Sequence, residues 1–516
     1  MVFQTTDGFF AMRAPQSLFL VLILFLLASI LSLIVSHFSL PGAKHELEHY
    51  KAAALSRFSE ATACEVQIPA TCEASELVRY WSGSTDCYES PLRDVNGLHA
   101  APRDRKYVVM EPDLGGWNNI RMSLEVAIAF VLVTGRILVL PPHQILYLLA
   151  TKTRNGRTGV EDYVDLSRIQ LAKGVEIMPM SEFLRDVAAT GMLANKPFQL
   201  GEKESFETVR GRKLWDYLAD ACWSRPWQPG KTFLTLNTSV MEETFIDPVR
   251  LEDMAIPEQN RKLRWYDADM ASQRAVYFSG NPKNRLLTLF YAYLFFPTAK
   301  EERLVKRFVR DRVRYKDKIY CVGGRIVEQM ALLADPSVTL PYRSMQRTKY
   351  VAFHIRRGDF QHKWVKIPAE EILALTLCLV PDRARRVAYI ATDEQNSSFF
   401  DPFRAAFKQV YFLQDFTRGA YASIGLGDMQ RNELGMVEQV VCASSDVFIG
   451  TPLSTFTGYI TRMRGYMNAT VPGMYDRTFY YMQKHRNQLQ DSPHIHVPFW
   501  PREFVEAFEG IDERET

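Results

Sequence analysis

Several short motifs that identify common classes of nucleotide- and metal-binding protein are missing from this 516-residue sequence. None of its seven cysteines forms a CxxC pair, which argues against a structural zinc site. The GxGxxG fingerprint is absent, so we infer no NAD site. A GxxxxGKS/T element is also absent, which argues against a P-loop ATPase.

The sequence also lacks an excess of charge of either sign. It has 62 lysines and arginines against 59 aspartates and glutamates, and no long basic block. A general nucleic-acid-binding protein is therefore disfavoured, and we expect any bound anion to be held at a local site. Hydrophobic residues make up 47% and charged residues 23%, which is typical of a globular chain. The length predicts about two to four domains.

One long hydrophobic run stands near the N-terminus. Residues 17–37 contain no Lys, Arg, Asp or Glu, and their core is rich in Leu, Ile, Val and Phe. This is about the length needed to span a bilayer, and it exceeds the roughly 7–15 apolar residues of a signal peptide. The sequence therefore predicts an uncleaved transmembrane signal-anchor.

Sequons and cysteines predict the side of the membrane on which the bulk of the chain lies. Glycosylation sequons begin at Asn237, Asn396 and Asn468, and they have meaning only in a lumenal chain. Seven cysteines allow up to three disulfides in an oxidising lumen, although those that are scattered could be ordinary buried thiols. We expect a single-pass type II protein of the Golgi or ER membrane, with the C-terminal bulk of the chain lumenal.

The rest of the chain alternates short apolar runs with helical patterns. A strand at 107–110, a helix over 122–133 and a strand at 137–140 predict a β–loop–α–β unit of a parallel sheet. A second series begins at residue 350, with strands at 350–355, 386–391, 409–413 and 446–449 and helices near 368–379, 432–442 and 454–464. An aromatic stretch at 286–296 is predicted to be helical. The predicted divisions are a cytoplasmic tail 1–16, an anchor 17–37, a stem with cysteines 38–104, and Rossmann-like domains 105–343 and 344–505.

Three segments at expected strand ends carry the chemistry. The apolar run at 350–353 opens onto His354, Arg356 and Arg357, and paired guanidinium groups at a sheet edge suit a pyrophosphate. The alternative is a strand-end salt bridge, such as Arg357 with Asp359. Neither interpretation is favoured by this segment alone.

The other two segments are strand-to-helix turns. Gly115 and Gly116 allow close backbone approach to a ligand, and the following helix presents free N–H groups. The alternative is a simple turn with Asn118 or Asn119 as a cap. Similarly, Ser454 and Thr455 open a helix after the strand at 446–449 and form a second anion site, or Ser454 is only an N-cap.

Together these segments resemble the GDP-fucose protein O-fucosyltransferase family, including its plant and algal membrane-anchored members. The matching residues are 115–125 with 138–142, 354–360, 391–394, and the block from Glu438 through Ser454 to Tyr466. The resemblance implies an α/β protein of GT-B type, with two Rossmann-like domains facing a central cleft, preceded here by the transmembrane helix. It further implies an inverting, metal-independent reaction with the sugar nucleotide between the halves. No DxD motif stands at a convincing strand end, which fits a metal-free site.

The resemblance also implies a role for each site residue. Arg356 would hold the β-phosphate and stabilise the charge that develops as GDP departs. The turn at Gly115 and Gly116, with Asn118, would contact the donor, and Asn119 or Asn118 would face the fucose and the acceptor. Further roles concern the nucleotide: His354 and Asp393 would contact the nucleoside, and Ser454, Thr455 and Phe456 would line its pocket. Arg357 would support the site as a partner of Asp359.

The catalytic base is less defined by the sequence. Glu111 and Asp113 precede the glycine turn, and either could take a proton from the acceptor hydroxyl if it came within hydrogen-bond reach. Both could instead be turn residues, and the family resemblance also allows a reaction without an enzyme base.

We therefore expect transfer of fucose from GDP-fucose to a protein Ser/Thr or glycan hydroxyl, with no cofactor and no metal. The enzymatic alternative is a rhamnosyltransferase that uses UDP-rhamnose on a wall polysaccharide. The other is a catalytically silent, membrane-tethered protein that binds nucleotide sugars or glycans. Expected partners are GDP-fucose, the acceptor and the membrane, but not nucleic acid.

Overall fold

The computed structural model describes residues 104–146, 157–170, 175–193, 197–223, 268–280, 299–338, 348–417, 419–467 and 473–481, together with three short strands and a few C-terminal residues. All of these lie in one compact unit, Val66–Thr516. The predicted tail, anchor and most of the stem lie outside the described residues, as do the sequons at Asn237 and Asn468. Within the described ranges, no helix has the length and apolar character needed to cross a membrane.

The first sheet contains four parallel strands in the order β3-β2-β1-β6. Its strands are β1 (Tyr107–Met110), β2 (Ile137–Leu140), β3 (Glu176–Pro179) and β6 (Ala275–Phe278). Strands β1 and β2 are joined through helix α5 (Trp117–Thr134), so the predicted β–loop–α–β unit is confirmed. The helix begins five residues before the predicted start, because Asn118, Asn119 and Arg121 interrupt the apolar pattern in its first residues.

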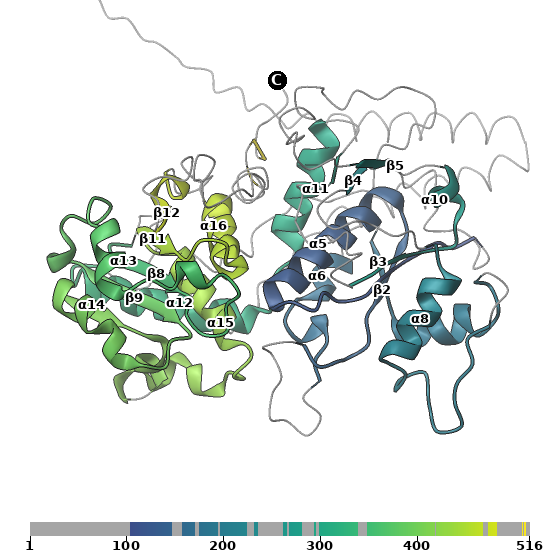
Figure 1. Cartoon of the computed structure of the whole chain (residues 1–516), viewed down its shortest axis with the longest axis horizontal. Coiled ribbons are helices and arrows are strands. Elements are labelled where there is room, and N and C mark those ends of the chain that lie inside the picture. The colour runs from purple at the N-terminus through teal and green to yellow at the C-terminus, as the bar shows by residue number, and fades with distance from the viewer. Residues whose placement is uncertain are drawn as a thin grey trace, which may run out of the picture. The chain divides into compact units, whose positions relative to one another are not determined.

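The second sheet contains five parallel strands in the order β10-β9-β8-β11-β12. Its strands are β8 (Val351–Ile355), β9 (Val387–Thr392), β10 (Gln409–Tyr411), β11 (Val447–Gly450) and β12 (Thr478–Tyr480). The accompanying helices are α13 (Ala369–Leu375), α14 (Asp401–Ala406), α15 (Leu434–Ala443) and α16 (Thr455–Met467). The four predicted strands are confirmed, whereas no apolar pattern indicated β12, a three-residue edge strand. Each sheet is flanked by its helices in Figure 1.

The segment between the two sheets adds shorter elements and one correction. Its helices are α6 (Leu166–Gln170), α7 (Met180–Phe183), α8 (Arg212–Ala221), α10 (Ala268–Ser272), α11 (Ala299–Arg312) and α12 (Asp317–Ala334), with one π-helical turn at Leu184–Ala188. A small parallel sheet has the order β5-β4-β7 and comprises β4 (Thr232–Thr235), β5 (Lys262–Trp265) and β7 (Leu294–Phe295). The helical prediction for 286–296 is therefore wrong at β7, because pairing with β4 decides the conformation of an aromatic run that suits either state.

Helix α5 joins the core of the first sheet to the C-terminal half of the chain. It packs against β1, β2, α11 and α16, and every residue except Asn119 is buried. From residue 126 to residue 133 the helix is hydrophobic on all sides, as expected for a helix buried in a core. Conversely, α12 lies before the predicted domain boundary at residue 343, yet it packs against α15 and β9 of the second sheet. The division itself falls in 339–347, outside the described residues.

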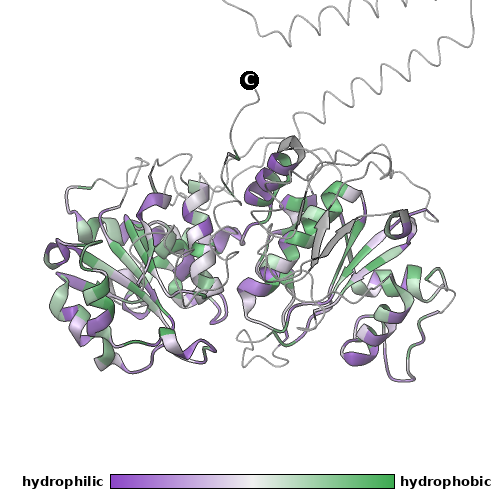
Figure 2. Cartoon of the chain, turned by 45° about the horizontal axis from the view of Figure 1, so that its top comes forward, coloured by the Kyte–Doolittle hydropathy of each residue, from purple (hydrophilic) through white to green (hydrophobic). Residues whose placement is uncertain are grey.

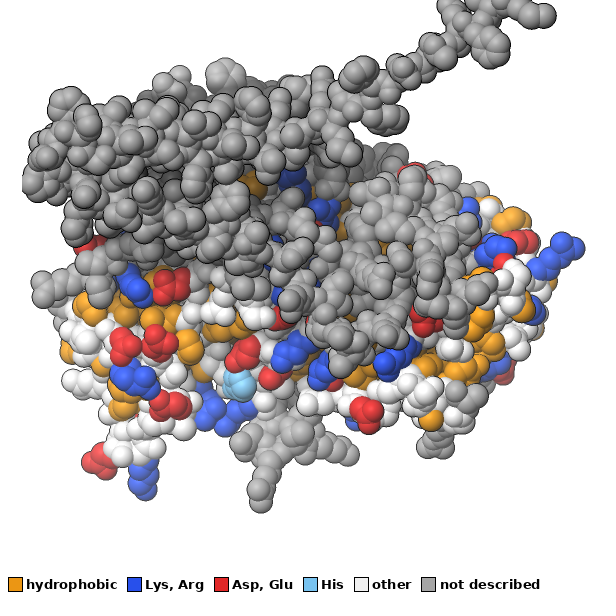
Figure 3. Space-filling model, turned by 180° about the vertical axis from the view of Figure 1, so that it is seen from behind, with side chains coloured by type: hydrophobic (Ala, Val, Ile, Leu, Met, Phe, Trp, Pro, Cys, Tyr) orange, Lys and Arg blue, Asp and Glu red, His pale blue; other side chains and the backbone are white. Residues whose placement is uncertain are grey.

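The strands of both large sheets are hydrophobic along their length, as Figure 2 shows. In β1, β2, β6, β8 and β11 every residue is buried, which is typical of parallel strands covered on both faces. On the face shown in Figure 3, acidic and basic side chains are interspersed and do not segregate by sign.

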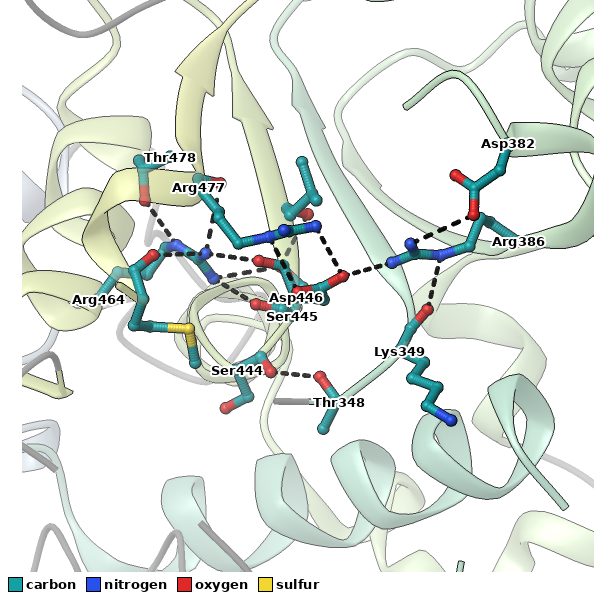
Figure 4. Close-up of polar contacts among 12 residues, drawn as sticks. Thr348, Lys349, Asp382, Arg386, Ser444, Ser445, Asp446, Arg464, Arg477 and Thr478 are labelled. Atoms are coloured by element: carbon teal, nitrogen blue, oxygen red, sulfur yellow. Dashed lines mark hydrogen bonds and ion pairs between the residues drawn. The ribbon is translucent and has the colours of Figure 1, made fainter. Parts of the chain in front are cut away.

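A buried arginine connects the amino ends of β11 and β12 in the second sheet through hydrogen bonds (Figure 4). Arg464 of α16 donates to the backbone carbonyl oxygens of Ala443, Ser445, Asp446 and Met474, and to the Thr478 hydroxyl. The Asp446 carboxylate also accepts from Arg386 at 2.6 Å and Arg477 at 3.0 Å. Burial lowers the pKa of Arg464 to about 9. This cluster lies at the amino ends of β11 and β12, so it leaves their carboxyl ends available for a site.

Candidate functional site

A cavity of about 420 Å³ lies where β8, β9 and β11 end and where α5, α15 and α16 contribute side chains. Carboxyl ends of parallel strands are the usual ligand-binding edge of open α/β folds. Ten predicted site residues line it: Gly115, Gly116, Asn118, Asn119, His354, Arg356, Asp393, Ser454, Thr455 and Phe456. Glu111 and Asp113 do not line it. The fold thus brings the three sequence segments to one place.

Arg356 directly follows β8, and three partners hold it at the carboxyl end of that strand. Its guanidinium pairs with the Asp393 carboxylate and donates to the Asp359 carbonyl oxygen at 2.7 Å. Its backbone N–H donates to the Thr451 hydroxyl at 2.9 Å. The side chain remains 19% exposed, so a ligand in the cavity can reach it. A Cβ on Gly358 would lie 2.5 Å from Asp393 Oδ2, which explains why only glycine fits beside this pair.

Arg357 does not pair with the Asp359 carboxylate as the sequence suggested. Its Nε donates to Glu394 at 2.8 Å, its Nη1 donates to the Ile367 carbonyl oxygen, and its guanidinium lies over the Phe399 ring. The correction has a simple cause. Strand β9 runs beside β8, so the residues that follow β9 are closer in space than the sequence neighbour.

His354 forms part of the cavity wall as a neutral imidazole. Its Nδ1 lies 2.7 Å from the Thr457 hydroxyl, and its ring stacks on Phe456 with centroids 4.4 Å apart. Burial lowers the pKa of His354 to about 3, and the positive charge of Arg356 acts in the same direction against the opposing effect of Asp393. The stacked pair therefore presents an uncharged aromatic surface near the arginine.

The glycine turn before α5 has no side-chain cap. Gly116 precedes the helix in an extended conformation, and Asn118 and Asn119 lie in its first turn, so the prediction that one of them caps the helix is wrong. The reason is that the helix begins earlier than its apolar pattern. A Cβ on Gly115 would lie 2.2 Å from Asn119 Nδ2, so a larger residue at this position would displace the Asn119 side chain from its place in the cavity lining.

The two proposed bases are engaged in hydrogen bonds outside the cavity lining, Asp113 within the turn and Glu111 with the end of β6. The Glu111 carboxylate accepts from the Tyr277 hydroxyl at 2.6 Å, the Ser279 hydroxyl at 3.1 Å and the Gly280 N–H at 2.9 Å. Asp113 is buried and accepts from the Gly115 N–H at 2.6 Å. In this arrangement both carboxylates stabilise the backbone that carries the glycine turn.

The loop that leads into α16 has an unusual backbone. Leu453 has a φ of 60°, and it is the one non-glycine residue with positive φ among the described residues. It lines the cavity and packs against Tyr480. Ser454 immediately precedes α16, and its carbonyl oxygen accepts from the Gly458 N–H at 2.9 Å. Strained backbone of this kind is concentrated at ligand sites.

Sequence reasoning assigned no site role to eleven residues of the lining, although several lie in the segments that match the family, and two of them matter most. Glu438 and Gln439 lie side by side in α15, a helix of otherwise apolar character. A polar pair inside a hydrophobic helix is the signal that could have identified them. Burial raises the pKa of Glu438 to about 8, and the negative charge of Asp393 acts in the same direction. The other nine are Trp117, Asp359, Phe360, Gln361, Thr392, Asn432, Gly435, Met436 and Leu453.

The described residues also show which side chains could bind a metal ion and which cysteines form disulfides. Among the described residues, no group of three or more His, Cys, Asp or Glu side chains is placed to hold a metal ion. Cys321 is disulfide-bonded, whereas Cys222, Cys378 and Cys442 are free thiols. The scattered cysteines are therefore mostly ordinary thiols, and at least one takes part in a disulfide.

Parallel sheets with a polar, arginine-containing cavity at their carboxyl edge define an α/β protein that is suited to an anionic nucleotide ligand. The sequence pattern of the GDP-fucose protein O-fucosyltransferase family matches residues 107–467. The chain belongs to this family of glycosyltransferases, so the resemblance drawn from its motifs is confirmed.

Solved structures of fucosyltransferases are similar over most of the chain, but only weakly. POFUT1 in complex with GDP is 14% identical, with 73% of this chain and 98% of that chain covered and a TM-score of 0.34. NodZ α-1,6-fucosyltransferase soaked with GDP-fucose is 14% identical, covering 70% and 92% with a TM-score of 0.31. A point mutant of Arabidopsis thaliana FUT1 in complex with GDP is 10% identical, covering 77% and 78% with a TM-score of 0.32. Comparison with curated proteins gives no match. The family assignment therefore rests on the sequence pattern.

Proposed function

We propose that the protein transfers fucose from GDP-fucose to a hydroxyl of a protein Ser/Thr or a glycan, with inversion and without a metal ion. The observation that carries the proposal is the Arg356 guanidinium, held by Asp393 and still exposed to a cavity that the family's three motifs build together. The proposed arrangement is of GT-B type, with the donor between the two Rossmann-like halves.

Arg356 is the group that would act on the leaving diphosphate. As the bond between fucose C1 and the phosphate oxygen breaks, negative charge accumulates on GDP. A fixed guanidinium donates two parallel hydrogen bonds to such an oxyanion and stays charged at every physiological pH. Because Asp393 and the Asp359 carbonyl already orient it, little reorganisation is needed during the reaction.

Glu438 is the candidate for recognition of the base. A carboxylate accepts from both the N1–H and the 2-amino group of guanine, whereas uracil offers a single N–H between two carbonyl oxygens. Glu438 lines the cavity, and burial raises its pKa although an interaction with the Tyr389 hydroxyl opposes the shift, so the surrounding protein compensates its charge only in part. Guanine would supply two donors, which favours GDP-fucose over UDP-rhamnose.

The acceptor hydroxyl must lose a proton during transfer. We propose that no enzyme base is required, with the proton passing to the departing phosphate. The positions of Glu111 and Asp113 support this, because both carboxylates hold the turn together and neither reaches the cavity lining.

We further propose that residues 17–37 anchor the protein in the Golgi or ER membrane with residues 38–516 in the lumen. The charge-free run and the disulfide at Cys321 support this topology, because disulfides persist in oxidising compartments. Protease treatment of intact microsomes tests it, and digestion of the C-terminal bulk without detergent would contradict it.

The test of the function is ligand-induced stabilisation followed by a transfer assay. Purified full-length protein is melted with GDP, GDP-fucose, UDP or UDP-rhamnose, each with EDTA, since a ligand that binds only the native state raises the Tm. We expect a shift with the guanine nucleotides alone. Arg356→Ala should lower transfer at least about a hundredfold with an unchanged Tm of the ligand-free protein. Arg404→Ala, at an exposed residue of α14 paired with Asp401, is the matched control and should retain full transfer.

Each other outcome contradicts a specific part of the proposal. Stabilisation by UDP-rhamnose would identify a rhamnosyltransferase. Stabilisation by GDP-fucose without turnover on any acceptor, and without hydrolysis of the donor, would indicate a binding protein. Full transfer by Arg356→Ala would remove the proposed role of that residue.

A further inference from the structure

Four side chains form a continuous hydrogen-bonded chain that ends at the cavity. Trp117 Nε1 donates to the Tyr315 hydroxyl oxygen at 3.3 Å, and that hydroxyl donates to Gln439 Oε1 at 2.7 Å. Gln439 Nε2 then donates to Asn118 Oδ1 at 3.0 Å. All four residues are buried, and Gln439 is only 1% exposed. Trp117, Gln439 and Asn118 line the cavity, whereas Tyr315 supports them from behind.

The direction of every hydrogen bond in this chain is fixed by its two ends. An indole N–H can only donate, so the Tyr315 oxygen must accept from Trp117 and send its own proton to Gln439 Oε1. At the other end, the Phe456 backbone carbonyl can only accept, and it lies 3.4 Å from Gln439 Nε2. Both ends therefore impose the same orientation on the Gln439 amide.

A second contact keeps Tyr315 in this arrangement. The Arg121 guanidinium lies 4.0 Å from the centroid of the Tyr315 ring and 3.8 Å from that of Tyr459. Arg121 can only donate hydrogen bonds, so it cannot compete with Gln439 for the tyrosine proton. The aromatic ring is thus packed in place while its hydroxyl proton points to Gln439.

The consequence for Asn118 is that its carboxamide has a defined orientation. Its oxygen is engaged by Gln439, so its amino group is the polar group left for a ligand. We propose that Tyr315 and Gln439 are positioning residues that fix Asn118 as a hydrogen-bond donor to an oxygen of the bound sugar nucleotide. The proposal rests on the function proposed above. The opposite orientation would present a carbonyl oxygen to an anionic ligand and weaken its binding.

The effect should be measurable in donor affinity. A hydrogen bond to a charged acceptor typically contributes about tenfold to a hundredfold in affinity. Gln439→Glu keeps the shape but replaces both donors with an acceptor, so we expect the Kd for GDP-fucose to rise by about that factor. Gln439→Leu, which adds no charge, should raise it as well. Equal effects on GDP and GDP-fucose would place the contacted oxygen on the nucleotide, and an effect on GDP-fucose alone would place it on the sugar.

The decisive measurement repeats both substitutions in an Asn118→Ala background with full-length protein and calorimetric titration. If Gln439 acts through Asn118, neither substitution should weaken binding further there. Gln409→Glu is the matched control, because exposed Gln409 also accepts from a tyrosine hydroxyl, that of Tyr411, but lies outside the cavity lining. It should bind GDP-fucose as the wild type does.

The possible failures are distinguishable. If the wild type binds GDP-fucose and the losses are simply additive with Asn118→Ala, the positioning role is overturned while the function stands. If the wild type binds neither GDP nor GDP-fucose, the function fails, and the same proteins are then melted without ligand. If the losses of Tm in the Gln439 variants and in Asn118→Ala are additive, the positioning role of Gln439 is overturned as well. Non-additive losses would support the contact between Gln439 and Asn118.

Discussion

At the scale of single residues, the site depends on side chains whose chemistry is changed by their surroundings. His354 and Glu438 both line the cavity, and burial favours the neutral form of each: it lowers the pKa of the imidazole to about 3 and raises that of the carboxyl to about 8. Arg356 remains the charged group that Asp393 orients. The cavity lining therefore combines a charged guanidinium at Arg356 with a carboxyl at Glu438 that is mostly protonated at neutral pH.

The shifted carboxyl makes stability depend on pH in a defined direction. With a pKa of about 8 instead of 4.5, folded Glu438 holds a proton that the unfolded chain has lost between these values. Its contribution to stability is thus fully present below pH 4.5 and is lost as the pH rises through 8. We expect the Tm of the wild type to fall relative to that of Glu438→Gln, in which residue 438 does not titrate, from about pH 5 to about pH 9.

The same group predicts how ligand binding responds to pH. If guanine pairs with the ionised carboxylate, GDP affinity should rise by up to about tenfold per pH unit between pH 6 and 8. Glu438→Gln should remove that rise. His354 does not interfere, because its own protonation occurs far below this window. A pH-independent Kd in the wild type would contradict recognition of the base by Glu438.

The two turn carboxylates give a second prediction for single residues. Glu111→Gln and Asp113→Asn keep the shape and an acceptor oxygen for the Tyr277 and Gly115 donors. If no enzyme base is used, both variants should retain transfer to within about tenfold, measured as kcat, whereas loss of a general base typically costs about a hundredfold or more. A loss of that size with unchanged Tm would restore the variant residue as the base.

At the scale of elements, the second sheet is anchored where its strands begin. Arg464 reaches from α16 to backbone carbonyl oxygens before β11 and near β12, and Asp446 connects the same region to Arg386 ahead of β9. Figure 4 shows these side chains converging from separate elements. Fixing the starting ends allows the opposite ends to carry the strained loop at Leu453 and the pair of Arg356 with Asp393.

Substitution of Arg464 should lower the free energy of unfolding. Arg464→Met leaves several buried carbonyl oxygens without a donor, and each such group costs about 1–3 kcal/mol, so we expect a loss of about 3 kcal/mol or more. Urea unfolding measures it. Lys349→Met removes an ion pair between exposed Lys349 and Asp335 on the same side of the sheet and should change stability little. Similar values for the two variants would show that the cluster is not structural.

At the scale of the whole molecule, a buried ionic contact joins the two halves of the chain. Glu125 of α5 accepts from Arg462 at 2.5 Å and from Tyr459 at 2.7 Å, both on α16, and from Arg121 one turn away. Glu125 and Arg462 are each only 1% exposed. Arg121, which pairs with Glu125, also packs on the ring of Tyr315, so the contact adjoins the hydrogen-bonded side chains that reach Asn118.

Breaking this contact should destabilise the connection between the halves. Glu125→Gln leaves two buried guanidinium groups without their carboxylate, which typically costs about 3–5 kcal/mol. The unfolding midpoint in urea should fall accordingly, and tryptophan fluorescence should report it. Asp216→Asn breaks an exposed pair with Arg212 and serves as the control, with little expected change. An unchanged midpoint in Glu125→Gln would show that apolar packing alone holds α5 against α16.

Sequence alone determined the parts that depend on local pattern. Short apolar runs that end in polar or glycine residues predicted strands β1, β2, β8, β9, β10 and β11, because a buried parallel strand needs continuous apolar residues. The motifs at their ends identified ten residues of the cavity and the family, since residues at the carboxyl ends of parallel strands meet at one edge.

Only the tertiary structure decided which side chains meet. Arg357 pairs with Glu394 because β9 lies beside β8, and Glu111 turns to Tyr277 because β6 lies beside β1. Glu438 and Gln439 reach the cavity because α15 packs against β8, β9 and α12, and this packing depends on contacts between elements that are distant in the sequence. Hydrogen-bond partners and pKa values depend on distances across the fold, whereas strands, turns and motifs depend on neighbours along the chain.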